Sequence, residues 1–233
     1  MVRVTIHEMG RIFSSGVNAM MTLYTYTTPN GRKISIMLEE LGIPYNVKVI
    51  NLSKQEQFDP SFTAISPNNK IPAIVDNTNE AAPVALFESG AILTYLAEKY
   101  DRFLPPVGPA RYKTLEWLYW QVGGLGPMFG QLSHFGIFAT EKMPAATKRY
   151  REEGERLLKV MERQLETHAF LAGDDYSIAD MAAYPWAFNA DTFLSEFLGD
   201  AVATMPAVQR WLTTVGERPA VQRGMDVPVI NAD

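Results

Sequence analysis

The sequence predicts a two-domain protein, in which a small α/β domain with the element order βαβαββα is followed by an all-helical domain. Short strand patterns alternate with amphipathic helix patterns up to residue 100, whereas only helix patterns follow residue 109. A Pro- and Gly-rich stretch at 105–109 is typical of a linker. We therefore expect an N-terminal extension at 1–20, an α/β domain at 21–101, a linker at 102–108, a helical domain at 109–225 and a tail at 226–233.

The first half of the α/β domain has the pattern strand, helix, strand. Met21–Tyr26 alternate and are rich in aromatic and β-compatible side chains, which predicts a strand. A helix follows, because apolar residues from Ile34 to Leu41 repeat at i, i+3, i+4 and i+7. Gly42 is a helix stop, and Tyr45–Ile50 predict the second strand. Strands joined by such a helical crossover are expected to be parallel.

The second half of the α/β domain ends in a hairpin and a helix. Residues 51–57 are predicted as a polar loop, and a later strand opens on Pro72. Val84–Phe87 predict the hairpin partner of that strand. Ser89 is the expected N-cap of a helix that runs to residue 100. A small mixed sheet with helices on its faces matches the thioredoxin arrangement.

The remainder of the chain is predicted to be helical. Tyr112–Thr140 indicate a long aromatic-rich helix that is interrupted by glycines and a proline at 123–127. Pro144–His168 indicate a second long helix. Ser177, with an acid three residues later, is a capping-box pattern that opens an apolar helix, and another helix begins at Pro206. We expect a ligand cleft between the two domains.

Composition excludes several functional classes. The 233 residues carry a formal net charge of −5, which disfavours nucleic acid or an anionic membrane as a partner. No apolar run approaches the roughly 18 residues of a membrane span. The chain contains no cysteine, so it has no disulfide, no thiolate metal ligand and no thiol nucleophile of its own. Its three histidines are far apart, and we expect no metal site.

Residues 1–20 are interpreted as an extension of a cytoplasmic protein. Arg3, Arg11 and two serines faintly resemble an organelle-targeting segment, which is the alternative. Glu8 argues against that alternative, and Met20-Met21 offers another start.

The stretch Thr27-Thr28-Pro29-Asn30-Gly31 lies directly between the first strand and the first helix. It places a hydroxyl, an amide and backbone N–H groups at the positive end of a helix dipole, where an anion is stabilised. The side chains of Thr28 and Asn30 could donate hydrogen bonds to a bound thiolate and so lower a thiol pKa from about 8.5. The same residues are also good turn and N-cap formers, which is a purely structural alternative.

Two further junctions could contact a ligand. A proline that opens a strand after two asparagines makes Ile71-Pro72 a candidate cis peptide, whose backbone could pair with a bound peptide. The alternative is an ordinary trans proline at a sheet edge. At the last strand–helix junction, Ser89 could hold a carboxylate and Glu88 an ammonium, or Ser89 could simply cap its helix.

Arg149 lies on the second long helix among other basic residues. It is either a cation that reaches toward the cleft or part of a solvated helix face.

Taken together, these segments resemble the glutathione transferase superfamily over roughly residues 22–225. The superfamily features are the Ile71-Pro72 strand, Phe87-Glu88-Ser89-Gly90-Ala91-Ile92 and Tyr176-Ser177-Ile178-Ala179-Asp180. Within it the chain is similar to the nu class, which comprises bacterial disulfide-bond reductases related to a fungal nitrogen-regulator prion protein. The motifs that carry this second resemblance are Thr28-Pro29-Asn30-Gly31, Ser66-Pro67-Asn68-Asn69-Lys70-Ile71-Pro72-Ala73-Ile74-Val75-Asp76 and Trp120-Gln121-Val122-Gly123-Gly124-Leu125-Gly126-Pro127-Met128.

The resemblance implies a homodimer whose thioredoxin-like domain binds glutathione. It implies that Thr28 and Asn30 contact the glutathione sulfur and that Arg149 reaches a second glutathione. The remaining implied glutathione contacts are Gln57, Lys70, Ile71, Pro72, Glu88 and Ser89. The catalytic tyrosine, serine or cysteine of other classes is not evident, because Tyr24 and Tyr26 lie within the strand.

The expected activity is glutathione-dependent disulfide reduction. Without cysteine, exchange would run between a bound glutathione thiolate and a bound disulfide. Glutathione would be a substrate, with no tightly bound cofactor. Conjugation of glutathione to electrophiles, or peroxide reduction, is the alternative that uses the same thiolate. A non-catalytic regulatory protein is the alternative from another class.

Overall fold

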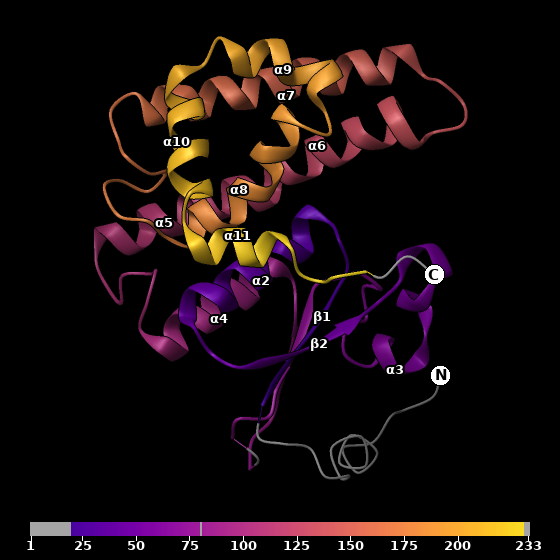
Figure 1. Ribbon diagram of the computed structural model, residues 1–233, viewed down its shortest axis with the longest axis vertical. Helices are drawn as coiled ribbons and strands as arrows, with labels where there is room; N and C mark the ends of the chain where they lie inside the picture. Colours follow the sequence, from indigo (N-terminus) through magenta and orange to yellow (C-terminus); the bar gives the residue numbers. More distant parts are fainter. Residues whose placement is uncertain (1–19, 80, 231–233) are drawn as a thin grey trace.

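The computed structural model describes residues 20–79 and 81–230 and shows an α/β domain followed by a helical domain (Figure 1). The predicted fold class is confirmed. The residues of the extension, 1–19, lie outside the described part, so the interpretation of that segment stays a prediction.

The α/β domain is built on a four-stranded sheet in the order β2-β1-β3-β4. Strands β1 (Met21–Thr25) and β2 (Tyr45–Val49) are parallel, as the helical crossover predicted. Strand β3 (Ala73–Asp76) runs antiparallel to β1 and to its hairpin partner β4 (Val84–Phe87). The side chains of β3 are all buried, which places this strand at the centre of the domain.

Helices α2 (Pro29–Leu41) and α4 (Ser89–Tyr100) flank the sheet, and short α3 (Pro60–Thr63) follows β2. Two predictions need correction here. Residues 51–57 are not an open loop, because the Asn51 side chain caps a 3₁₀ turn at Leu52–Lys54 and a second turn spans Glu56–Phe58. Ser89 is the first residue of α4 rather than its N-cap, which is Glu88.

The helical domain begins with a long continuous helical segment. Its parts are α5 (Pro109–Trp120), a π-helical turn (Gln121–Leu125), α6 (Gly126–Ser133) and a second π-helical turn (His134–Phe138). The glycines and proline at 123–127 were predicted to interrupt this helix, and a π-helical turn separates α5 from α6 at these residues. The residues of this turn remain helical, so the chain continues from α5 into α6 without an intervening loop.

Five further helices complete this domain. They are α7 (Pro144–Leu165), α8 (Ile178–Asp191), α9 (Ser195–Ala203), α10 (Pro206–Gly216) and α11 (Pro219–Met225). Helices α7, α8 and α10 begin where they were predicted. Helix α7 ends at Leu165, three residues before the predicted end at His168. Helices α9 and α11 have no counterpart in the sequence analysis. No helix in the described ranges is both long and apolar enough to cross a membrane.

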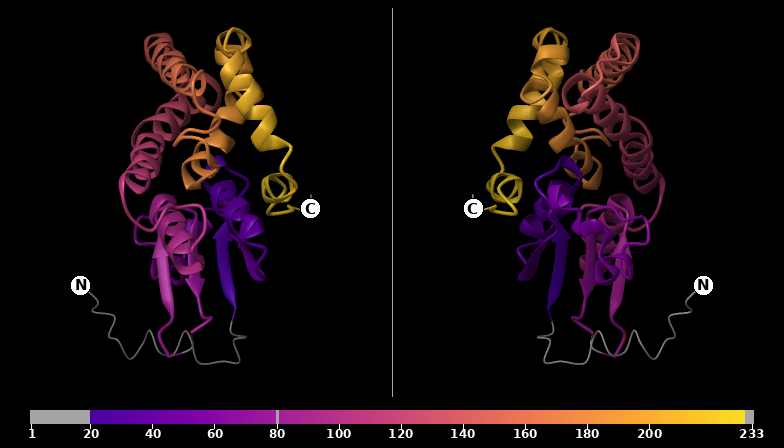
Figure 2. Two further views of the ribbon diagram at one scale, coloured as in Figure 1. Left: turned by 90° about the vertical axis from the view of Figure 1, so that its left-hand side faces the viewer. Right: turned by 90° about the vertical axis from the view of Figure 1, so that its right-hand side faces the viewer.

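The last helix, α11, joins the two domains. It descends from the helical domain and lies against α2, as Figures 1 and 2 show. The Ser35 hydroxyl donates to the Gly224 carbonyl at 2.6 Å, and a Cβ on Gly224 would lie 2.5 Å from the Ile36 Cα. Two ion pairs, Arg218–Glu40 and Arg223–Glu39, flank this close approach. The glycine therefore permits backbone contact between the domains.

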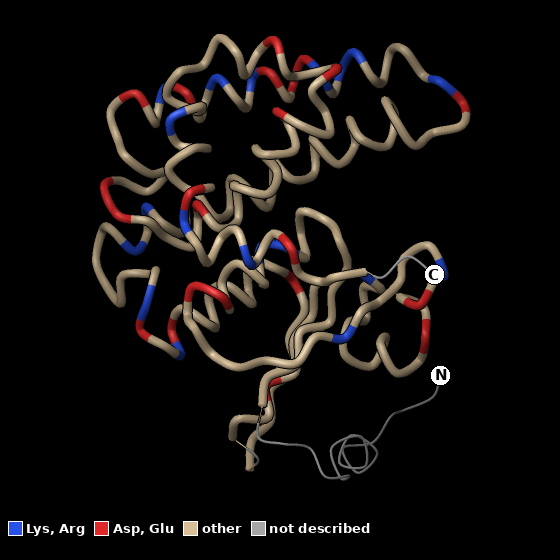
Figure 3. The backbone as a smooth tube through the Cα atoms, viewed as in Figure 1, with Lys and Arg blue, Asp and Glu red and all other residues tan. Residues whose placement is uncertain are grey.

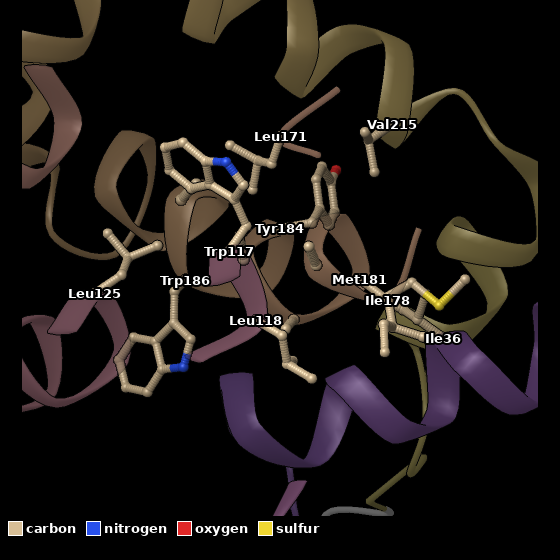
Figure 4. Close-up of a cluster of buried hydrophobic side chains, with 14 of the residues drawn as sticks. Ile36, Trp117, Leu118, Leu125, Leu171, Ile178, Met181, Tyr184, Trp186 and Val215 are labelled. Atoms are coloured by element: carbon tan, nitrogen blue, oxygen red, sulfur yellow. The ribbon is translucent and has the colours of Figure 1, made fainter. Parts of the chain in front are cut away.

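One hydrophobic core continues across the domain junction. Ile36 on α2 lies in the same buried cluster as Leu118 of α5 and Ile178 and Met181 of α8 (Figure 4). Burial of such side chains contributes roughly 1.5–3 kcal/mol each. The two domains are therefore held in a defined relative position, and so is the cleft between them.

The predicted capping box at the start of α8 is confirmed and extended. Asp180 is fully buried, and its carboxylate accepts hydrogen bonds from the backbone N–H and the hydroxyl of Ser177, both at 3.0 Å. It also accepts from the Leu171 N–H at 3.0 Å and the Trp211 indole at 2.9 Å. One carboxylate thus connects α8, α10 and the preceding loop.

Replacement of this carboxylate is expected to destabilise the protein strongly. Asp180→Ala leaves four buried donors without their acceptor, and we expect it to lower the free energy of unfolding by about 3 kcal/mol or more. Asp175→Ala, at an exposed position in the same loop, is the control, with an effect within about 0.5 kcal/mol. Denaturant unfolding followed by circular dichroism measures both. Equal midpoints for the two variants would contradict the assigned role.

Candidate active site

The turn between β1 and α2 is formed as the sequence predicted. Thr28 has an extended backbone and caps α2, because its hydroxyl oxygen accepts a hydrogen bond from the Gly31 N–H at 3.3 Å. A Cβ on Gly31 would lie 2.3 Å from the Thr25 hydroxyl oxygen and 2.5 Å from the Tyr26 carbonyl oxygen. Only glycine fits at this position, and the tight turn places the start of α2 directly beside the strand end.

Thr28 and Asn30 both retain a hydrogen-bond donor for a ligand. The Thr28 oxygen accepts the cap bond, so its hydroxyl proton remains available. The Asn30 Oδ1 accepts from the Trp186 indole N–H at 3.1 Å. An indole N–H only donates, which fixes the orientation of the Asn30 amide and leaves its NH₂ group with no acceptor in the described part of the chain.

Two adjoining cavities lie at the domain junction beside this turn. The inner one, of about 270 Å³, is lined by the N-terminal part of α4, the segment at 70–72 before β3 and the first π turn with α6. The outer one, of about 730 Å³, extends from the β1–α2 turn to the end of α8. They form one cleft, since both are lined by Asn30, Lys70, Ile71, Gly130 and Trp186.

The predicted contacts at the inner cavity lie together. Ile71, Pro72, Glu88 and Ser89 all line it. The Ile71-Pro72 peptide bond is cis. Glu88 adopts a φ of 72°, a conformation that non-glycine residues rarely hold outside functional or tightly constrained sites. The sequence analysis therefore identified one wall of this cavity.

Gln57 and Lys70 lie at the outer cavity, which Lys70 shares with the inner one. The Oε1 atom of Gln57 is buried and has no hydrogen-bond partner within the described residues. The Gln57 carbonyl accepts from the Asn69 side chain at 3.1 Å, which holds this segment in place. Gln57 therefore offers an unused acceptor at the cleft.

Arg149 is not brought to the cleft. It is exposed on α7 and lines neither cavity. Basic and acidic residues alternate along this helix (Figure 3), where Lys148 pairs with Glu152 and Arg151 with Glu155. The geometry thus favours the alternative of a solvated helix face, and a contact of Arg149 with a second ligand stays a prediction.

The sequence analysis missed the aromatic wall of the outer cavity. Phe138, Phe188 and Phe193 line it and are 66%, 37% and 46% exposed. The rings of Phe138 and Phe193 are stacked at 5.7 Å between centroids. These residues come from the end of the second π turn, from α8 and from the segment after α8, so no local periodicity indicated that they meet. They give the cleft an apolar second compartment.

It also missed a buried lysine at the inner cavity. Lys33 on α2 is 2% exposed, and its ammonium donates to Gln121 Oε1 at 2.6 Å and lies 3.4 Å from the Ser89 hydroxyl. Burial lowers the pKa of Lys33 from 10.5 to about 7, although the nearby Glu88 carboxylate opposes this change. A lysine within a helix is usually solvated, so no sequence pattern indicated that Lys33 would be buried at the cleft.

Comparison with known proteins identifies the family. The family model described as "Glutathione S-transferase, N-terminal domain" matches residues 23–106, and "Glutathione S-transferase, C-terminal domain" matches residues 125–219. The disulfide-bond oxidoreductase YfcG of Escherichia coli is 47% identical over 88% of this chain and 94% of its own length. The chain belongs to the glutathione transferase family. The predicted superfamily is therefore confirmed.

Solved structures of the family share this fold closely. A glutathione transferase from Burkholderia graminis has a TM-score of 0.88 and 42% identity, with 95% of this chain and 93% of that one covered. It was solved with two glutathione molecules per subunit. A glutathione transferase from Pseudomonas putida, with one glutathione disulfide per subunit, has a TM-score of 0.86 and 41% identity over 94% of this chain and 96% of its own.

The tight turn makes a direct prediction about Gly31. Gly31→Ala forces a Cβ against backbone and a buried hydroxyl, and we expect it to lower the free energy of unfolding by about 2 kcal/mol and to distort the Thr28 cap. Gly123→Ala is the matched control, since nothing lies within 4 Å of its Cβ position, and it should be neutral or stabilising. Thermal unfolding measures both. A Gly31→Ala protein as stable as Gly123→Ala would contradict the constraint.

Proposed function

We propose that this family member is a glutathione-dependent disulfide reductase. The observation that carries the proposal is the pair of unused donors on Thr28 and Asn30, which face the cleft at the N-terminus of α2. A bound thiol placed there would receive two hydrogen bonds and the positive end of the helix dipole. Since the chain has no cysteine, the reactive sulfur belongs to glutathione.

The site would act by stabilising the thiolate. Hydrogen bonds to a charged acceptor contribute roughly 1.5–3 kcal/mol each, and about 1.4 kcal/mol lowers the thiol pKa by one unit, which is a tenfold change in the ratio of thiolate to thiol. The donors on Thr28 and Asn30 are a neutral hydroxyl and a neutral amide, so they would stabilise the thiolate through hydrogen bonds. Alignment of the two sulfurs in one cleft adds to the rate.

The reaction balances with two glutathione molecules. The first thiolate attacks one sulfur of the disulfide, which forms a mixed disulfide and releases one substrate thiolate that takes up a proton. A second glutathione thiolate then attacks the glutathione sulfur of the mixed disulfide, which releases the other substrate thiol and glutathione disulfide. The outer cavity adjoins the first thiol site and offers room for the second molecule.

The remaining glutathione contacts are assigned as part of this proposal. Ile71 presents its backbone to the cysteinyl group beside Pro72, and Gln57 and Lys70 hold the glycyl end. Glu88 and Ser89 hold the γ-glutamyl end at the inner cavity. The second glutathione is assigned to the outer cavity, and because Arg149 does not line that cavity, it is not assigned a contact there.

The test is reduction of a small disulfide by glutathione. We expect Asn30→Ala and Thr28→Val each to lower kcat/KM by about tenfold or more, because each removes one thiolate hydrogen bond. Trp186→Phe should act in the same direction, since it frees the Asn30 amide to rotate. Asn46→Ala, at an exposed position on β2, is the control and should retain full activity. A wild-type rate equal to the uncatalysed rate would reject the proposal.

Conjugation or peroxide reduction is a second candidate, favoured by one observation. The aromatic residues Phe138, Phe188 and Phe193 give the outer cavity an apolar wall suited to an organic electrophile. Turnover with an aryl halide, a hydroperoxide and a small disulfide under the same conditions ranks the three activities. Turnover with any of them, lost in Asn30→Ala, would exclude a purely regulatory glutathione-binding protein.

We also infer a homodimer that uses the outer face of α5. Tyr112 and Tyr119 are 70% and 66% exposed and lie seven residues apart on one side of this helix. Large apolar side chains gathered on a helix surface are typical of an interface.

Tyr119→Glu should therefore weaken the dimer. A charge on this face would be desolvated at the interface, and we expect the dissociation constant to rise at least about tenfold. Met143→Glu, at another exposed apolar residue, is the control. Analytical ultracentrifugation over a concentration series measures both variants. A wild-type protein that sediments as a monomer throughout would refute the inference.

A cytoplasmic location follows from the proposed chemistry. The reaction consumes reduced glutathione, and the cytoplasm keeps glutathione reduced. Cell fractionation tests this, and recovery of the protein outside the cytoplasmic fraction would contradict it.

A further inference from the structure

Lys33 is a buried cation with only neutral hydrogen-bond partners. Its ammonium contacts the amide oxygen of Gln121 and the hydroxyl of Ser89, and it forms no ion pair within the described residues. A fully buried lysine is rare and is usually paired with a carboxylate, because an unpaired buried charge costs several kcal/mol. Lys33 instead lines the inner cavity of the cleft.

The charges that act on Lys33 come from few elements. Glu88, at the start of α4, is the carboxylate that acts on it, and exposed Lys70 lines the same cavity. The first π turn contributes the neutral Gln121, and α8 contributes Trp186. The charged residues of α11 lie elsewhere: Arg218 and Arg223 pair with Glu40 and Glu39, and Asp226 acts on Arg32.

The inner cavity therefore carries opposite charges on neighbouring residues. The Lys33 ammonium and the Ser89 hydroxyl lie side by side and could both bind a carboxylate. Glu88, the residue before Ser89, could bind an ammonium. An α-amino acid group bears these two charges on one carbon. The γ-glutamyl end of glutathione is such a group, whereas its glycyl end carries a carboxylate alone.

We propose that Lys33 is a glutathione-binding residue whose ammonium pairs with the α-carboxylate of the γ-glutamyl group. This inference rests on the proposed function, since it requires that glutathione occupies the cleft. Lys33 then selects for an α-carboxylate, in addition to the contacts assigned to Ser89 and Glu88. Gln121 acts as a positioning residue, because its amide oxygen holds the lysine head at the cavity.

Binding would then be coupled to protonation of Lys33. Burial lowers the pKa of Lys33 to about 7, and a ligand carboxylate beside the ammonium would raise it. Below about pH 6 the lysine is already charged, so binding takes up no proton. Above pH 7, binding requires proton uptake, and affinity falls with rising pH by up to about tenfold per unit until the pKa of the bound state is reached.

Calorimetry with S-methylglutathione tests the coupling, because this ligand has no titrating thiol. Titrations in two buffers of different ionisation enthalpy give the number of protons taken up. We expect almost none at about pH 6 and a value approaching one at about pH 8. An S-methylated glutaryl analogue, which lacks the α-amino group, should show the same uptake. A 4-aminobutyryl analogue, which lacks the α-carboxylate, should show none.

The variant Lys33→Met tests whether the preference for the α-carboxylate depends on this lysine. At about pH 6, wild-type protein should bind the 4-aminobutyryl analogue at least about 30-fold more weakly than S-methylglutathione, as expected for loss of one partner of a buried charge pair. In Lys33→Met this discrimination should largely disappear, together with the proton uptake. Lys113→Met is the control, since Lys113 is exposed and pairs with Glu116 on the outer surface of α5.

The outcomes separate this inference from the proposed function. No binding of S-methylglutathione or glutathione by the wild type overturns both. A different outcome is that S-methylglutathione binds without proton uptake, and that wild type and Lys33→Met prefer it over the 4-aminobutyryl analogue by the same factor. That result overturns the role of Lys33 alone and leaves the proposed function standing. If Lys33→Met does not fold, the affinities of the wild type for the three ligands and the number of protons taken up with each still test the role of Lys33.

Discussion

The placement of α2 between the sheet and the helical domain is the constraint on which the site depends. Its N-terminus carries Thr28 and Asn30, and its buried face carries Lys33. The helical domain supplies a hydrogen-bond partner to both regions of α2. The Trp186 indole donates to Asn30, and Gln121 accepts from Lys33. Because the far side of α2 packs directly on α11, a shift of the domains would disturb both ends of the cleft together.

The two ends of the cleft offer different groups to a ligand, although charged side chains line both cavities: Arg32 the outer one and Lys70 both. At the thiol end the donors are a hydroxyl and an amide, whose orientation is set by the cap of α2 and by an indole. At the inner end a lysine and a glutamate lie close together. The hydroxyl and the amide stabilise a thiolate through hydrogen bonds, while opposite charges at the inner end recognise a zwitterion. The proposed binding and the proposed chemistry therefore use different interactions.

The sequence predicted the elements that depend on local pattern, and it failed where packing decides. The strands, the start of α2, the capping box at Ser177 and the helix start at Pro206 are as expected. Gly123 and Gly124 were expected to break or bend a helix, and they lie in a π turn that separates α5 from α6 while the chain stays helical. Ser89 has N-cap chemistry, yet its hydroxyl faces Lys33 instead, and Glu88 takes the cap position. Local propensity is weak beside such tertiary contacts.

Local sequence patterns were sufficient to predict the family, the thioredoxin-like topology, the turn at Thr28–Gly31 and one wall of the cleft. The absence of cysteine alone required that any thiol chemistry use a borrowed sulfur. Long-range folding was needed for the rest, because Trp186 lies 156 residues from Asn30 and Gln121 lies 88 residues from Lys33. The pKa of a buried lysine and the orientation of an amide depend on groups that meet only when distant helices pack, which no local pattern encodes.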